Sequence, residues 1–145
     1  MKNSNTKCDS LRLENQICFP MYAASREIIK LYKPYLDGVG LTYTQYIAMM
    51  LLWEKEKMTS KEMGERLYLD SGTLTPMLKK LEQKGYICRK RSKSDERNLE
   101  ISITELGKEL REKAEDIPEQ MAKCVKITRD EAVNLYGILY KILER

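Results

Sequence analysis

The feature that most constrains the fold is the segment 71–103, where a helical pattern passes directly into an alternating one. The stretch TLTPMLKKLEQKG has the apolar spacing of a helix and ends at Gly85, a residue type that commonly stops a helix in a left-handed conformation. Leu99, Ile101 and Ile103 then alternate with polar residues, which is the period of a half-buried strand. YICRKR is its predicted antiparallel partner, and SKSDERN is the exposed tip between them.

Three helices are predicted before this segment. The apolar residues between Leu11 and Leu36 follow the three-to-four spacing of an amphipathic helix, and Pro34 marks its last turn or a kink. The next helix, TQYIAMMLLWEKE, is apolar nearly all round and should therefore lie in the core. Thr59, followed three residues later by Glu62, forms the reciprocal cap that begins a third helix.

Two more helices are predicted after the hairpin. Apolar residues share one face until Pro118, and Thr128 with Glu131 forms a second capping box before AVNLYGILYKILER. Proline is tolerated in a helix only within the first turn, so Pro76 predicts that its helix begins near Thr73 or that the turn before it is irregular.

This order of elements describes a winged helix-turn-helix, which is a mostly α fold with a small β-hairpin wing. The 145 residues fit one domain, 1–145, with the DNA-binding region at about 44–104. The helices at about 11–36 and 105–145 are too apolar to remain solvated, so we expect them to form the dimerisation region of a homodimer. Such a dimer would place two recognition helices ~34 Å apart on a pseudo-palindromic operator of double-stranded DNA.

The positive charge of the chain is concentrated in the hairpin. The formal net charge of +4 decides little alone, but clustered basic residues release counterions when they neutralise phosphates. The predicted DNA-binding residues are Ser71, Thr73, Thr75 and Lys79 on the helix and Arg89, Arg91, Lys93, Asp95 and Arg97 on the hairpin. We expect Arg97 to enter the minor groove, braced by Asp95. A solvated basic turn is the other interpretation of the hairpin, and the adjacent helix-turn-helix makes DNA binding the better one.

The chain contains four cysteines and no histidine. The usual general base is therefore missing, the isolated cysteines do not form a zinc motif, and we predict neither an enzyme nor a metal or other cofactor. No apolar run approaches the length of a membrane span, so no membrane partner is expected. Free thiols persist in a reducing compartment, which predicts a cytoplasmic location.

Cys18 lies in the stretch LENQICFPMYAASREIIKLYKPYLD, one helical turn before Tyr22. A reactive thiol must be in the thiolate form, which tyrosine hydroxyls stabilise by donating hydrogen bonds. We expect Cys18 about two turns inside its helix, where the effect of the helix dipole has faded. A small apolar side chain in the dimer core is the alternative role of this cysteine.

The stretches YLDSGTLTPMLKKLEQKG and RKRSKSDERNLEISITELG resemble the MarR family of dimeric winged-helix repressors. The Cys18 stretch, together with LTYTQYIAMMLLWE, resembles the organic hydroperoxide resistance regulators (OhrR) within that family. The resemblance implies a bacterial repressor that lies on the nucleoid when bound to its operator. An organic hydroperoxide would oxidise its cysteine to a sulfenic acid, which a small thiol or a second cysteine then caps. The repressor would leave the DNA, and peroxide-detoxification genes would be expressed.

By this resemblance Cys18 is the redox-sensing cysteine, and Tyr22, Tyr32 and Tyr43 match the tyrosines that hydrogen-bond its thiolate. Tyr32 follows Cys18 by fourteen residues, or roughly 21 Å along a straight helix, so it would have to come from the other subunit.

The other cysteines and the effector leave alternatives open. Cys124 lies where two-cysteine sensors carry their resolving cysteine, and an inert half-exposed thiol is the equal alternative. Cys88 alternates into the hairpin as a packing residue, and Cys8 belongs to a polar tail that we expect to be disordered. The alternative function is a MarR-type repressor that is released by a small aromatic or phenolic ligand instead of by thiol oxidation.

Overall fold

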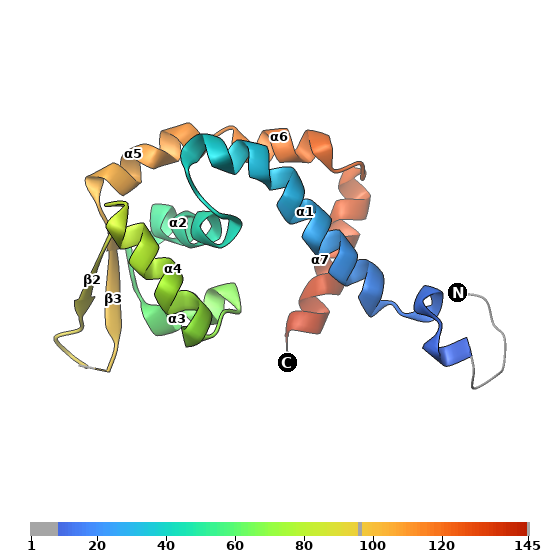
Figure 1. Ribbon diagram of the computed structural model, residues 1–145, viewed down its shortest axis with the longest axis horizontal. Helices are drawn as coiled ribbons and strands as arrows, with labels where there is room; N and C mark the ends of the chain where they lie inside the picture. The colour runs from blue at the N-terminus through green and yellow to red at the C-terminus, as the bar shows by residue number, and fades with distance from the viewer. Residues whose placement is uncertain (1–8, 96, 145) are drawn as a thin grey trace.

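The structure, a computed structural model, describes residues 9–95 and 97–144 and has the predicted winged helix-turn-helix fold (Figure 1). Its helices are α1 (Cys18–Val39), α2 (Tyr43–Lys55), α3 (Ser60–Leu67), α4 (Ser71–Gln83), α5 (Glu105–Ala114), α6 (Ile117–Cys124) and α7 (Arg129–Leu143). Its strands are β1 (Lys57–Thr59), β2 (Ile87–Arg91) and β3 (Leu99–Ile103). Two short 3-10 turns, Asp9–Leu11 and Leu13–Asn15, precede α1.

The molecule is an arch. The sheet and α2, α3 and α4 form one end of it, α5 and α6 run across the top, and α1 and α7 descend to the other end (Figure 1). The largest fully buried side chains all lie in the first of these ends: Met49, Leu52, Met63, Leu78, Leu81 and Ile101. The hydrophobic core therefore fixes the recognition helix α4 against α2, α3 and the sheet.

The predicted hairpin is confirmed, and a third strand joins it. β2 and β3 are antiparallel, with Ile87 opposite Ile103 and Arg91 opposite Leu99. β1 pairs with the other edge of β3, where buried Met58 lies opposite Ile101. The sequence did not reveal β1, because a strand of three residues has too little alternation to show its period.

Helix α1 begins at Cys18 and not near Leu11 as predicted. Pro20 explains the difference: proline is tolerated in a first helical turn, whereas a helix extending back to Leu11 would hold it in the interior. Pro34, in contrast, lies inside α1, which continues to Val39 and ends at Gly40 with a left-handed φ of 68°.

Two other helix boundaries differ from the prediction. α4 begins at Ser71, because the Asp70 side chain caps it by accepting a hydrogen bond from the backbone N–H of Thr73 at 2.8 Å. Pro76 consequently lies in the second turn, and the predicted start near Thr73 is wrong. The helix that was expected to run until Pro118 is divided into α5 and α6, with Pro118 in the first turn of α6.

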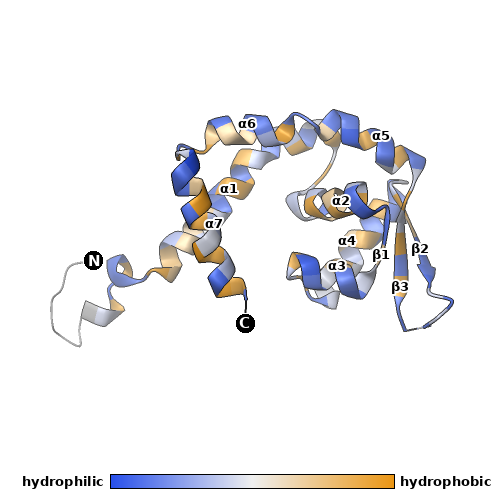
Figure 2. Ribbon diagram, turned by 180° about the vertical axis from the view of Figure 1, so that it is seen from behind, coloured by the Kyte–Doolittle hydropathy of each residue, from blue (hydrophilic) through white to orange (hydrophobic). Residues whose placement is uncertain are grey.

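Helix α7 has no buried residue among those that the structure describes. Its apolar side chains are instead exposed, including Val133, Leu135, Tyr136, Ile138 and Ile142. Further exposed apolar side chains lie on α1: Phe19, Tyr22, Ile28, Ile29 and Leu31. Figure 2 shows apolar residues along both helices at the end of the arch far from the wing. Within the described residues, no helix is both long and apolar enough to cross a lipid bilayer.

Candidate functional site

Three of the predicted DNA-binding residues form one exposed stripe on α4. Ser71, Thr75 and Lys79 follow each other at intervals of four residues, so they share a helix face, and all three are exposed. Thr73 does not belong to this stripe. Its hydroxyl donates to the Asp70 carboxylate at 3.3 Å, so it takes part in the cap of α4.

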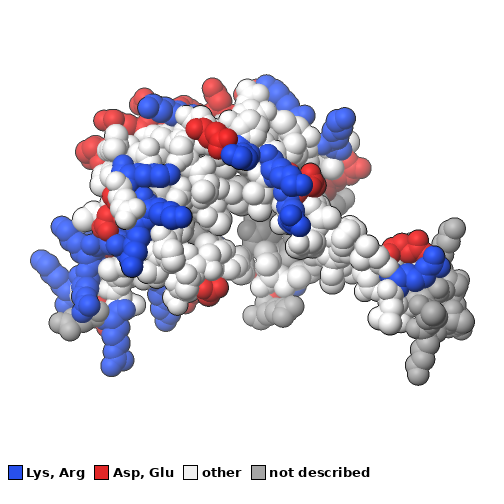
Figure 3. Space-filling view, viewed as in Figure 1, with Lys and Arg blue, Asp and Glu red and all other residues white. Residues whose placement is uncertain are grey.

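The wing carries the exposed basic residues Arg91, Lys93 and Arg97. Figure 3 shows Lys and Arg side chains gathered over this end of the molecule. Asp95 was expected to brace the Arg97 guanidinium, but its carboxylate accepts from the backbone N–H of Arg97 at 3.0 Å and from the side-chain amide of Asn98 at 3.2 Å. Asp95 therefore fixes the backbone of the turn, and the Arg97 side chain projects from that turn.

Arg89 is held by Glu82 of α4. Its guanidinium donates to one carboxylate oxygen at 3.0 and 2.7 Å, and its backbone N–H donates to the other at 2.9 Å. The Arg89 side chain is only 18% exposed. Its contact with DNA stays a prediction, and the structure adds a structural role, because this ion pair joins the wing to α4. The sequence prediction missed Glu82, whose partner lies seven residues away on another element.

The Glu82 brace should make stability depend on pH. Hydrogen bonds from Arg89 hold the pKa of Glu82 below its ordinary value, so the brace stabilises the fold above the ordinary pKa and is lost as pH falls through the lowered one. Glu82→Gln should lower the melting temperature at pH 7 by roughly 2–4 °C and flatten its fall below about pH 5. Thermal unfolding between pH 3 and 8 measures this. Glu112→Gln, which changes an exposed carboxylate on α5, should leave the profile unchanged.

The recognition helix and the wing tip face one surface hollow of ≈ 650 Å³. Ser71, Thr75 and Arg97 are among its lining residues, together with Tyr68 and Asn98. The fold thus brings together predicted residues that are far apart in the sequence, while the other exposed basic residues of the wing lie outside the hollow. A surface lined by hydroxyls and an arginine can hydrogen-bond to base edges and to phosphates.

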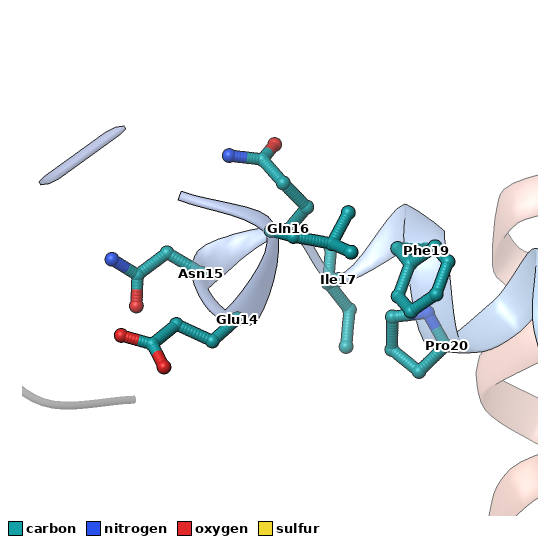
Figure 4. A pocket seen from close by; sticks show the side chains of 7 residues that line it. Glu14, Asn15, Gln16, Ile17, Phe19 and Pro20 are labelled. Atoms are coloured by element: carbon teal, nitrogen blue, oxygen red, sulfur yellow. The ribbon is translucent and has the colours of Figure 1, made fainter. Parts of the chain in front are cut away.

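Cys18 is exposed and is the first residue of α1. The expectation that it lies two turns inside the helix is wrong, because α1 begins at Cys18 and so keeps Pro20 in its first turn. A helix start has unpaired backbone N–H groups and the positive end of the helix dipole, both of which are absent two turns further inside. Ile17 and Phe19, the sequence neighbours of Cys18, line a small, mainly apolar hollow of ≈ 280 Å³, shown in Figure 4, whose lining also includes Glu14, Asn15 and Gln16 but not Cys18 itself.

Tyr22 lies on the same helix face as Cys18, and its hydroxyl is engaged by Arg26. The Arg26 guanidinium donates to this hydroxyl at 2.9 Å and lies 5.5 Å from the ring centroid. Since the hydroxyl accepts this bond, its own proton remains available to a thiolate. Within residues 9–95 and 97–144, no hydrogen bond reaches the Cys18 sulfur. Arg26 was missed, although its spacing of four from Tyr22 is that of an interacting helix pair.

Tyr32 and Tyr43 form an aromatic cluster at the junction of α1 and α2. Their ring centroids are 4.9 Å apart, and Tyr46 lies 5.9 Å from Tyr32. Burial raises the pKa of Tyr32 and of Tyr43 above the ordinary value, so both stay protonated hydrogen-bond donors at neutral pH. Cys18 and Tyr32 are fourteen residues apart in one continuous helix, about 21 Å. A single chain therefore does not bring this cluster to the thiol.

Cys124, at the end of α6, contacts Tyr35 of α1, with 3.4 Å between the sulfur and the hydroxyl oxygen. This hydrogen bond raises the pKa of Tyr35. Tyr35 follows Cys18 by seventeen residues along α1, about 25 Å, whereas a disulfide needs Cα atoms within about 7 Å. One chain therefore cannot join Cys18 to Cys124.

The two remaining cysteines are Cys88 and Cys8. Cys88 is half-buried on β2 opposite Ser102, and Cys8 lies outside the described residues. In the part of the chain that the structure describes, no group of three His, Cys, Asp or Glu side chains could hold a metal ion.

Known proteins similar to this chain are transcriptional regulators. Residues 30–117 match the family described as transcriptional regulator SarA/Rot. An organic hydroperoxide resistance transcriptional regulator of Bacillus subtilis is 55% identical over 138 residues, which cover 95% of this chain and 94% of that one. The regulator SarZ of Staphylococcus epidermidis is 50% identical over 123 residues, covering 85% and 83%.

Solved structures agree with these relatives. Reduced AbfR bound to DNA has a TM-score of 0.77 and 37% identity, and the comparison covers 96% of this chain and 97% of that one. The disulfide form of AbfR, a protein of Staphylococcus epidermidis, has a lower TM-score of 0.62 at 38% identity, covering 95% and 94%.

Proposed function

Because this chain belongs to the MarR/SarA-type family of winged-helix transcriptional regulators, we propose that it is a redox-sensing repressor. The reduced protein binds operator DNA, an organic hydroperoxide oxidises Cys18, and the oxidised protein dissociates, so that peroxide-detoxification genes are expressed. The observation that carries the proposal is the exposed position of Cys18 at the start of α1, beside an apolar hollow.

The proposed reaction is a two-electron oxidation of the thiol. The Cys18 thiolate attacks one oxygen of the hydroperoxide, the O–O bond breaks, and the organic part leaves as an alcohol after taking a proton. The sulfur becomes a sulfenic acid. A small thiol then condenses with it, forming a mixed disulfide and releasing water. The apolar lining of the neighbouring hollow, including Ile17 and Phe19, suits the organic group of such a peroxide.

The active form is proposed to be a homodimer built by α1 and α7. The exposed apolar side chains of both helices support it, because a second copy would remove them from water. The dimer would also supply the missing tyrosines. Tyr32 and Tyr43 of one copy can stabilise the Cys18 thiolate of the other, whereas within one chain Tyr32 is about 21 Å from Cys18.

In the proposed DNA complex, α4 enters the major groove with Ser71, Thr75 and Lys79, and the wing reaches the minor groove through Arg97. The higher TM-score with DNA-bound reduced AbfR than with its disulfide form supports a DNA-binding arrangement of the elements. The two heads of the dimer would read half-sites of a pseudo-palindrome about one helical turn apart.

Arg97→Ala should weaken operator binding about tenfold and reduce the steepness of its salt dependence, because one cationic contact is lost. Fluorescence anisotropy with labelled operator at several salt concentrations measures both. Lys33→Ala removes a positive charge from α1 at a distance from the wing and should change the affinity by less than about twofold. Unchanged affinity and salt dependence in Arg97→Ala would exclude the minor-groove role.

The fate of oxidised Cys18 has two proposed branches. A small thiol can cap it, or Cys124 of the second copy can form an intersubunit disulfide, as the disulfide form of AbfR suggests. The hydrogen bond with Tyr35 fits either branch: it holds Cys124 in place for reaction, or it holds the thiol as an inert packing group.

The experiment that tests the function treats the reduced, operator-bound protein with one equivalent of cumene hydroperoxide. Anisotropy follows the DNA, and intact mass with a non-reducing gel follows the thiol, before and after a small thiol is added. We expect oxidation of Cys18 and release of operator. A thiol adduct identifies the one-cysteine branch, and a cross-linked dimer identifies the two-cysteine branch. Retention of operator by fully oxidised protein contradicts the proposal.

A hollow between α2 and α5 favours a second candidate, release by a small aromatic ligand. It has a volume of ≈ 380 Å³ and is lined by Tyr46, Met50, Trp53 and Arg111, among others. The aromatic side chains suit an aromatic ring, and Arg111, Glu54 and Glu115 offer hydrogen-bond partners for a phenolic hydroxyl. Saturable release of operator by salicylate under fully reducing conditions would support this function, and no release at millimolar concentration would exclude it for this ligand.

A further inference from the structure

We propose that the hydrogen bond from Trp53 to Gly107 is the contact through which oxidation at Cys18 reaches the recognition helix. Trp53 is then a positioning residue for the release of DNA. This inference rests on the proposed function and specifies how its sensing site controls DNA binding.

The bond joins the last part of α2 to the first turn of α5. The indole N–H of Trp53 donates to the carbonyl oxygen of Gly107 at 2.8 Å in a partly buried setting. The next residue, Lys108, makes a second contact between these helices, with its ammonium 3.2 Å from the Glu56 carboxylate. That ion pair is weak, because the two side chains are 39% and 66% exposed. The indole bond is therefore the more directed of the two contacts.

Gly107 is held on its other side by the turn that ends α4. A Cβ atom at Gly107 would lie 2.2 Å from the carbonyl oxygen of Tyr86, so the two backbones are in direct contact. Thr104, which caps α5, donates its backbone N–H to the same oxygen at 3.0 Å and its hydroxyl to the carbonyl of Gly85. A displacement of the first turn of α5 must therefore move the C-terminal end of the recognition helix.

Aromatic contacts connect the Trp53 indole to α1. The Trp53 ring centroid is 6.3 Å from that of Tyr46, which is 3% exposed, and the Tyr46 ring is 5.9 Å from Tyr32. The proposed function places Tyr32 beside the Cys18 thiolate of a second copy. Rings packed at this density cannot move independently, so a displacement of Tyr32 after oxidation shifts Tyr46 and the indole with it.

The chemistry of the indole makes this contact a two-state element. An indole has a single N–H donor and no acceptor, so the bond to Gly107 is either made or lost. In this structure it is made, and the proposal assigns it to the DNA-binding form. Its loss after oxidation would let α5 and the end of α4 take a different position, which is what a switch requires.

Trp53→Phe tests the inference because phenylalanine keeps an aromatic ring and lacks the N–H group. We expect Cys18 to oxidise at the wild-type rate by intact mass. The reduced variant should bind operator about fivefold or more weakly than wild type, because it lacks the bond that holds α5 in place, whereas the oxidised variant should bind like oxidised wild type. The ratio of the oxidised to the reduced dissociation constant should fall about fivefold or more. Lys108→Gln is the matched control: it removes the charge that pairs α5 with Glu56 at the end of α2 and should keep the wild-type ratio.

The unaltered protein offers a second readout, because Trp53 is its one tryptophan. Its fluorescence emission should change when Cys18 is converted to a thiol adduct, in the absence of DNA. An unchanged emission, an unchanged ratio in Trp53→Phe, or an equal loss of the ratio in Lys108→Gln would each overturn the inference and leave the proposed function standing. Oxidised wild-type protein that keeps its operator would instead overturn the proposed function, and the inference with it.

Discussion

Replacing Gly107 by alanine should destabilise the fold by about 3 kcal/mol, which lies at the upper end of the cost of overpacking. The added Cβ would lie 2.2 Å from the carbonyl oxygen of Tyr86 and 2.8 Å from a side-chain carbon of Ile103. A backbone oxygen cannot turn aside as the end of a flexible side chain can, so α5 or the turn after α4 must shift. Urea unfolding followed by circular dichroism measures the loss, and operator binding should fall with it.

Gly38→Ala is the matched control for this prediction. Gly38 lies in α1 with no atom within 4 Å of the position that a Cβ would take. Alanine is favoured over glycine inside a helix, so this variant should gain roughly 0.5–1 kcal/mol. If Gly107→Ala lowers the free energy of unfolding and Gly38→Ala raises it, the loss is due to the close approach at Gly107. Equal stability of Gly107→Ala and wild type would contradict the tight junction between α5 and the recognition helix.

Cys18→Ser should abolish the response to hydroperoxide while it preserves DNA binding. The reduced wild type and the variant should have operator affinities within about twofold, because Cys18 is exposed on α1, far from the wing. One equivalent of cumene hydroperoxide should release the wild type and leave the variant bound, since a serine hydroxyl does not form a sulfenic acid. Anisotropy at matched protein concentration measures the difference, which should exceed tenfold in affinity.

Two cysteine controls make this result specific. Cys88→Ser should respond like wild type, because Cys88 is a half-buried residue of the wing strand. Cys124→Ser should also respond if a small thiol caps Cys18, and should form no cross-linked dimer. Release of Cys18→Ser as efficient as that of wild type would remove Cys18 from the mechanism.

The sequence predicted those parts of the fold that local patterns determine. Alternation from Leu99 to Ile103 and the stop at Gly85 gave the hairpin and the end of α4, and both are present. The start of α1 was placed too early because the apolar spacing was traced back past Pro20 to Leu11. Pro20 itself indicates the boundary, since proline is tolerated only in the first helical turn. Local periodicity thus identified the elements better than their ends.

Contacts between distant residues could not be predicted in this way. Trp53 and Gly107 are 54 positions apart, and their hydrogen bond arises only when α5 folds back against α2. The pairing of Arg89 with Glu82 likewise depends on how β2 returns along α4. Basic residues of the wing therefore looked equivalent in the sequence, while the fold exposes Arg97 and pairs the half-buried Arg89 with Glu82.

The length of α1 has a genetic consequence. If each sensing site joins Cys18 of one copy to Tyr32 of the other, neither polypeptide forms a complete site alone. Two alleles with different site substitutions can then complement each other. A mixed pair formed by a Cys18→Ser chain and a Tyr32→Phe chain would gather both lesions into one site. The other site would be whole, so a cell carrying both alleles would regain a response that neither allele gives alone.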